Sequence, residues 1–180
     1  MKFIEKLLAA SRNNKSLLCI GLDPDPKLMP YSDVFKFNQA IIDATSDLVC
    51  AYKPNLAFYE ALGIKGLKAL EETVTHIPKG IVTIGDAKRA DIASSSKAYA
   101  KALFDTFGFD ATTVNPYLGY DSIAPFIAYA DKGVFILCKT SNAGAADFQE
   151  SLYSESRSSA GARPLFELSL IHISEPTRPY

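Results

Sequence analysis

Residues 80–91 read GIVTIGDAKRAD, an apolar run that passes directly into charged residues. The apolar part predicts a buried strand, as in sheets covered on both faces. Asp86 and Lys88 lie two residues apart at the strand end, so their side chains point to the same side. Asp91 follows where a helix is expected to begin. The stretch predicts either a charged site or a solvated cluster with Asp91 as helix N-cap, and by itself it leaves both open.

Apolar and amphipathic segments alternate on both sides of this stretch. Short apolar runs predict strands at residues 17–22, 49–53, 80–84, 111–114 and 133–138. Helical spacing of apolar residues predicts helices at residues 3–12, 34–48, 58–77, 92–107 and 122–130. Strict alternation indicates an α/β fold whose parallel strands are joined by right-handed crossovers. Doubly wound sheets and (β/α)8 barrels both have this pattern.

Polar residues at the predicted strand ends favour the barrel. Each strand is followed by its own polar group: Asp23, Lys53, Asp86 with Lys88, Asn115, and residues 139–142. A barrel carries functional residues at the carboxyl ends of many strands, whereas a doubly wound sheet gathers them at one switch point. A complete barrel needs eight strands and roughly 250 residues. We therefore expect residues 1–167 to form an incomplete (β/α)8 TIM barrel of about five βα units.

The last residues, 168–180, match no expected element of such a barrel. They look like translated sequencing-adapter sequence, and we interpret them as a tail of doubtful origin on a truncated reading frame. The alternative is a genuine short strand and turn. His172 lies in this segment, and we assign it no role.

Composition excludes several classes of function. The formal net charge is −1, so no basic surface for nucleic acid or membrane is expected. The N-terminus lacks a signal-peptide core, and no apolar run could cross a bilayer. Cys19, Cys50 and Cys138 each lie in an apolar run, without CxxC spacing. These features predict buried, reduced thiols in a cytoplasmic protein, and no zinc site.

Lys53 ends the strand that precedes Asp86 along the chain. Adjacent barrel strands would place the two side by side, and Lys53, Asp86, Lys88 and Asp91 would form an array of alternating charge. The alternative is a lysine that extends along the rim into solvent. Asp23 could likewise form a turn before Pro24 or accept hydrogen bonds from sugar hydroxyls.

Five ordered motifs resemble those of the orotidine 5′-monophosphate decarboxylase family. They are GLDP at residues 21–24, YKPN at 52–55, DAKRADI at 86–92, NPYLG at 115–119 and KTSN at 139–142. The resemblance runs from about residue 3 to about residue 150. It implies decarboxylation of orotidine 5′-monophosphate (OMP) to uridine 5′-monophosphate (UMP), the last step of de novo pyrimidine synthesis. It also implies that no metal and no organic cofactor takes part.

The resemblance implies roles for four catalytic residues. Lys88 would donate a proton to C6 of the pyrimidine, and Asp86 would lie against the substrate carboxylate. Lys53 would pair with Asp86 and touch the ribose. Asp91 would reach into the site of a neighbouring subunit, so that a homodimer is needed for catalysis.

The resemblance also implies substrate-binding residues. Asp23 would bind the ribose, Asn55 would belong to the same site, and Ser95 replaces a threonine often found near ribose and phosphate. Ser141 and Asn142 would lie by the base; without the resemblance they could equally be loop residues. Ala143 stands where the family is expected to have proline. Residues that bind the phosphate are expected in strands beyond these five.

Two other functions remain open at this level. A related barrel could use the D-x-K-x-x-D pattern with Mg²⁺ as a sugar-phosphate decarboxylase or aldolase, without a need for Lys53 or the Ser141-Asn142 pair. The chain could also be an inert, non-enzymatic fragment. A doubly wound nucleotide-binding module would need a glycine-rich phosphate loop, which this sequence lacks. We expect the chain as written to have little or no decarboxylase activity.

Overall fold

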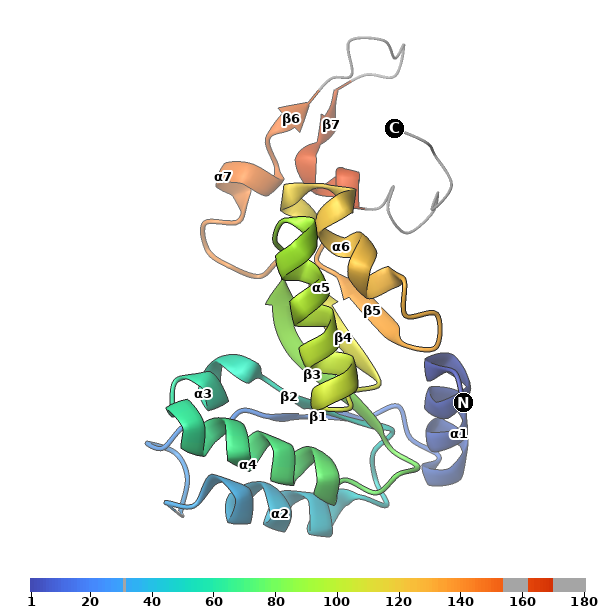
Figure 1. The fold of residues 1–180 in the computed structure, drawn as a ribbon, viewed down its shortest axis with the longest axis vertical. Helices are drawn as coiled ribbons and strands as arrows, with labels where there is room; N and C mark the ends of the chain where they lie inside the picture. The colour runs from blue at the N-terminus through green and yellow to red at the C-terminus, as the bar shows by residue number, and fades with distance from the viewer. Residues whose placement is uncertain (31, 154–161, 170–180) are drawn as a thin grey trace.

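The computed structural model describes residues 1–30, 32–153 and 162–169. Its centre is a sheet of five parallel strands in the order β1-β2-β3-β4-β5, with each strand beside its neighbour in sequence (Figure 1). The strands are β1 (Cys19–Leu22), β2 (Ala51–Pro54), β3 (Val82–Arg89), β4 (Ala111–Val114) and β5 (Gly133–Ile136). A doubly wound sheet would reverse its order at a switch point. The uninterrupted order confirms five units of an α/β barrel.

The helices between β1 and β5 along the chain connect the strands and cover one face of the sheet (Figure 1). The helical segments of the described residues are α1 (Phe3–Asn14), α2 (Val34–Thr45), α3 (Leu56–Glu60), α4 (Gly63–His76), α5 (Ala93–Lys101), the π-helical η1 (Ala102–Thr106), the 3-10 turn η2 (Pro116–Leu118), α6 (Tyr120–Ile127) and α7 (Ala146–Gln149). A short antiparallel pair, β6 (Leu152–Tyr153) with β7 (Arg163–Pro164), precedes the 3-10 turn η3 (Leu165–Glu167).

Two predicted helices differ from the observed ones. The helix expected at residues 58–77 is broken between α3 and α4, where Gly63 has a φ of 63°. Glycine adopts this left-handed conformation without steric cost, so the chain can turn there. The helix expected at residues 92–107 changes to the π-helical η1, and Gly108 follows it with a φ of 73°.

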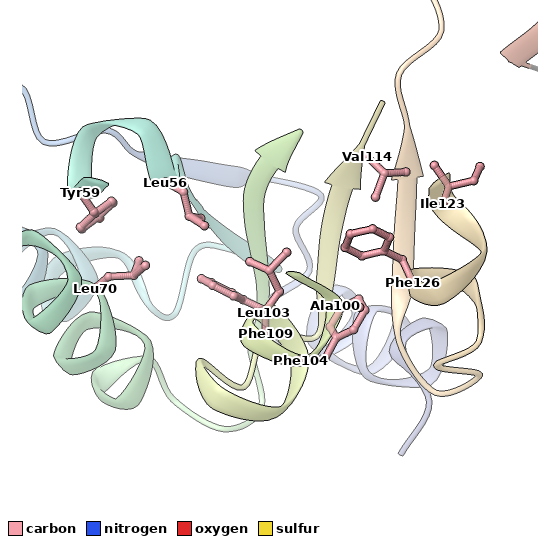
Figure 2. Packing of buried hydrophobic residues seen from close by; sticks show 10 residues of the cluster. All are labelled: Leu56, Tyr59, Leu70, Ala100, Leu103, Phe104, Phe109, Val114, Ile123 and Phe126. Atoms are coloured by element: carbon pink, nitrogen blue, oxygen red, sulfur yellow. The ribbon is translucent and has the colours of Figure 1, made fainter. Parts of the chain in front are cut away.

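The larger core cluster lies between β3, β4 and their covering helices, on what we call the outer face of the sheet (Figure 2). Its buried members are Leu56, Tyr59, Leu70, Ala100, Leu103, Phe104, Phe109, Val114, Ile123 and Phe126. Phe109 packs against Gly85, where a Cβ atom would come within 2.8 Å of the ring. Glycine directly before Asp86 thus lets the core hold β3 tightly on this face.

Helix α1 packs on the opposite, inner face. Phe3 and Leu7 contact a cluster formed by Ala10, Cys50, Ala51, Val82, Ile84 and Ala111. Because side chains alternate along a strand, Val82 and Ile84 share this face with Asp86. α1 therefore covers the amino-terminal part of the inner face and leaves its carboxyl-terminal part to the charged residues.

The prediction of three buried thiols is wrong for Cys19. Cys50 is buried and Cys138 is partly buried, but Cys19 is exposed. Cys19 lies in the edge strand β1 and alternates with Ile20, which packs toward the core of β1, β2 and α2. Its side chain therefore points to the less covered inner face. The tail expected at residues 168–180, with His172, falls mostly on residues 170–180, outside the described residues, and stays a prediction.

Candidate functional site

Strands β2, β3 and β4 bring polar side chains together at the carboxyl end of the inner face. Lys53 belongs to β2, Asp86 and Lys88 to β3, and Thr113 to β4. In each strand the site residue is two positions from an inner-facing apolar residue, as Lys53 is from Ala51 and Thr113 is from Ala111. The period of two along a strand thus aims Lys53, Asp86 and Thr113 at one place. Lys88 lies where the register of β3 is irregular, and its ammonium reaches the same place by its ion pair with Asp86.

Asp86 binds two ammonium groups, one at each carboxylate oxygen. Lys53 Nζ lies 2.9 Å from Oδ2, and Lys88 Nζ lies 2.7 Å from Oδ1. The side chain of Asp86 is 9% exposed, whereas those of Lys53 and Lys88 are 34% and 51% exposed. A carboxylate this deeply buried requires such partners. The arrangement holds two partly exposed ammonium groups against one buried carboxylate, which leaves one net positive charge at this end of the sheet.

Thr113 is a third partner of Asp86 that the sequence analysis missed. Its hydroxyl donates to Asp86 Oδ1 at 2.8 Å. The sequence pattern that could have identified Thr113 was present. Thr113 is a polar residue in an otherwise largely apolar predicted strand, the one that follows the Asp86 strand, and it lies two positions before Asn115. Strand periodicity would have placed it on the inner face.

The backbone at Lys88 is strained. Its φ is 49°, and Lys15 is the other non-glycine residue with positive φ in the described part of the chain. The left-handed conformation costs a residue with a Cβ about 1–2 kcal/mol. Strain of this kind gathers at functional sites, where the surrounding structure holds it in place.

Asp91 lies apart from the charge array expected for it. Within the described residues no ion pair joins Asp91 to a lysine; its Oδ1 accepts the amide of Ile92 at 2.7 Å. The predicted array of four is therefore an array of three within this chain. The N-cap interpretation fails as well, because Ile92 is the N-cap of α5.

The predicted substrate-binding residues surround the array at different distances. Asn55 forms a parallel bridge with Asp86, and its side chain caps α3 by accepting the amide of Ala57. Asp23 is exposed after β1, Ser95 is partly buried in the first turn of α5, and Ser141 and Asn142 are exposed after β5. In the described part of the chain, none of these four hydrogen-bonds to Lys53, Asp86 or Lys88. The structure thus joins Asn55 to the array and leaves the other four separate.

Burial alone would raise the pKa of Asp86. Hydrogen bonds from Lys88, Lys53 and Thr113, with the charge of Lys53, outweigh burial and lower this pKa to about 2. The two lysines therefore keep Asp86 ionised at every physiological pH.

This lowered pKa predicts a pH-dependent stability. A carboxyl whose pKa is lower in the folded state contributes stability above its unfolded pKa, and this is lost as the pH falls through the folded pKa. Between about pH 4 and pH 2 the chain is expected to lose about 2 kcal/mol of unfolding free energy through Asp86. Urea unfolding at both pH values measures this loss. The Asp86→Asn variant should no longer show this loss of unfolding free energy. The Asp47→Asn variant, changed at an exposed position, should still show it. An unchanged pH dependence in Asp86→Asn would contradict the assignment.

The described residues contain neither a candidate metal cluster nor a helix that could span a membrane. No group of three or more histidine, cysteine, aspartate or glutamate side chains that could hold a metal ion occurs there. In that same part of the chain, no helix has the length and apolar character needed to span a membrane.

Comparison with known proteins agrees with the geometry. A model of the "Orotidine 5'-phosphate decarboxylase / HUMPS family" matches residues 16–163. Over 150 residues the chain is 61% identical to an orotidine 5′-phosphate decarboxylase of Dehalococcoides mccartyi strain BAV1, covering 83% of this chain and 56% of the relative. A Herpetosiphon aurantiacus protein of the same name is 56% identical over 156 residues, covering 83% of this chain and 58% of that relative. The chain thus spans little more than half the length of these relatives.

Solved structures are similar in fold over nearly the whole chain. The OMP decarboxylase of Leishmania donovani has a TM-score of 0.84 and 36% sequence identity, covering 98% of this chain and 66% of that one. The UMP synthase of Leishmania donovani has a TM-score of 0.84 and 37% identity, covering 98% of this chain and 37% of that one. By the match of its sequence and of its strand order, the chain belongs to the orotidine 5′-phosphate decarboxylase / HUMPS family.

Proposed function

We propose that this chain supplies the catalytic lysines and aspartates for decarboxylation of OMP to UMP, without a metal or an organic cofactor. The observation that carries the proposal is one buried carboxylate, Asp86, held between the ammonium groups of Lys53 and Lys88. The names of the relatives support the substrate. A charged, soluble nucleotide as substrate suits a cytoplasmic enzyme with no nucleic-acid or membrane partner.

The reaction breaks the bond between C6 of the pyrimidine and the carboxylate carbon. CO₂ leaves, and the electron pair stays on C6. With no cofactor to accept this pair, an ammonium fixed near C6 stabilises the developing charge, and little reorganisation is needed at that moment. In the proposed mechanism Lys88 then transfers a proton to C6, which gives UMP and a neutral amine.

Asp86 acts by holding the lysines, and its charge also faces the substrate carboxylate. The proximity of two carboxylates disfavours bound substrate relative to the transition state, a smaller part of the proposal than the ammonium field. Lys53 and Asp23 are proposed to bind the ribose, and Asn55 and Ser95 to complete the pocket. Ser141 and Asn142 are proposed to contact the base.

A chimera tests the proposal. The matched residues of this chain are joined to the remainder of the Dehalococcoides mccartyi relative, and OMP consumption is followed by absorbance. We expect UMP formation that EDTA leaves unchanged. Activity abolished by EDTA and restored by Mg²⁺ would instead favour the metal-dependent sugar-phosphate class. A folded chimera that forms no UMP would overturn the proposal.

Asp91 is proposed to act in the site of a second subunit. Its side chain makes no ion pair with the lysines within the described chain, so it remains available to a partner. Lys88→Ala and Asp91→Ala chimeras, each inactive alone, should regain about a quarter of full activity when refolded together, because half of the dimers are hybrids with one intact site. Two Lys88→Ala chimeras refolded together serve as the control. No recovery in confirmed hybrid dimers would show that each subunit uses its own Asp91.

A further inference from the structure

The hydroxyl of Thr113 makes three hydrogen bonds, and only the bond to Asp86 belongs to the array described above. Oγ1 accepts the amide of Ala87 at 3.0 Å and the amide of Lys88 at 2.9 Å, and it donates to Asp86 Oδ1 at 2.8 Å. A hydroxyl has one proton to donate and two lone pairs that accept. All of its hydrogen-bonding capacity is therefore used at this one place.

The strand pairing explains why a side chain is needed there. Gly85 pairs with Thr112, and Arg89 pairs with Val114, so three residues of β3 lie opposite Thr113 alone. Such a bulge takes backbone amides out of the regular ladder. Amides that lose their ladder partner need another acceptor, and the Thr113 hydroxyl accepts those of Ala87 and Lys88.

The same bulge contains the left-handed residue Lys88, with its φ of 49°. A strained backbone persists when neighbouring groups determine it. The Thr113 hydroxyl binds the backbone of Lys88 and also the carboxylate that accepts the Lys88 ammonium at 2.7 Å. Both ends of the lysine are thus tied, directly or through Asp86, to one oxygen atom in β4.

We propose that Thr113 is a positioning residue that fixes the backbone of Lys88 and one oxygen of Asp86, so that the ammonium of Lys88 stays at the reacting carbon. This inference rests on the proposed decarboxylation for its purpose. Its physical content, the coupling of β4 to the bulge of β3, can be tested without any activity. Valine has nearly the shape of threonine and lacks the hydroxyl, whereas serine keeps the hydroxyl.

Thr112 provides the matched control. It is the preceding residue of β4, it is fully buried, and its hydroxyl donates to the Gly85 carbonyl at 2.8 Å. Thr112→Val therefore removes a buried hydroxyl from the same strand, and this hydroxyl donates to the backbone of Gly85 and not to the side chain of Asp86 or the backbone of Lys88. It separates a general loss of stability from a specific effect on the site.

The experiment is NMR on the full 180-residue chain, with carboxyl titration of Asp86 and amide hydrogen exchange. In Thr113→Val we expect the pKa of Asp86 to rise by roughly half a unit or more and the amides of Ala87 and Lys88 to exchange at least about tenfold faster. Thr113→Ser should match the unchanged chain, and Thr112→Val should leave both readings at the site unaltered.

Two outcomes would overturn the inference. One is a folded Thr113→Val chain whose Asp86 pKa and Lys88 amide exchange equal those of the unchanged chain. The other needs no variant that could fail to fold: a Lys88 amide that is unprotected in the unchanged, folded chain. A chimera that forms no UMP would remove the proposed function and leave the titration and exchange pattern intact, so the two failures can be told apart.

Discussion

Replacement of Lys88 by alanine is expected to lower the kcat of the chimera at least about 10³-fold, because it removes the group proposed both to stabilise the C6 carbanion and to donate the proton. Substrate binding should change much less, because Lys53, the residue proposed to bind the ribose, is retained. The measurement is UMP formation under saturating OMP, with KM determined alongside. The expected pattern is a large fall in kcat at a nearly constant KM.

Lys97→Ala is the matched control for this result. Lys97 lies in the following helix, α5, and is exposed to solvent. The kcat of the Lys97→Ala chimera should fall by less than about twofold, since an exposed side chain away from the site contributes little to stability or catalysis. A Lys88→Ala chimera that keeps more than a tenth of the kcat would contradict the role assigned to the lysine.

The 180-residue chain alone is expected to form UMP at least about 10³-fold more slowly than the chimera. The described residues supply five barrel strands, and the phosphate site of a barrel usually comes from the loops after strands seven and eight. Binding energy from the distal phosphate is used at the reacting carbon, so its loss lowers the rate as well as the affinity.

The assay compares equal concentrations of the chain and the chimera with OMP as substrate. Circular dichroism in the far ultraviolet serves as the control that the chain is folded. If the folded chain turned over OMP within tenfold of the chimera, the described strands would suffice for catalysis and the phosphate argument would be wrong.

The presence and approximate positions of the five strands could be predicted because they depend on local sequence, but the end expected for β3 at residue 84 was wrong, since β3 runs to Arg89. Buried parallel strands are short apolar runs, and the polar groups that follow them mark their carboxyl ends. The β4 strand was predicted with the bounds that the structure has. The break in the helix after Glu60 was missed because the segment keeps its apolar spacing through Leu62 and Leu67. Gly63 alone marks the turn, and a single glycine is also tolerated inside helices.

The contact between Lys53 and Asp86 was predicted because neighbouring strands of a parallel barrel align their carboxyl ends. The bulge opposite Thr113 was not, because it depends on the register between β3 and β4, which neither strand specifies alone. The expectation from the charge pattern that Asp91 joins the array within this chain was wrong. Its distance in sequence from Lys88 suits an ion pair, but the turn into α5 directs its carboxylate to the backbone of Ile92 instead.

In the proposed mechanism, Asp86 and Lys88 act as one unit in the transition state. A cycle of four chimeras measures this directly: unchanged, Asp86→Asn, Lys88→Ala and the double variant, compared by kcat for UMP formation. When two residues act together, the effects of their substitutions on kcat are strongly non-additive. We predict that the double variant falls no more than about tenfold below Lys88→Ala. Losses that simply multiply would show that the carboxylate and the ammonium work independently, and would contradict the account.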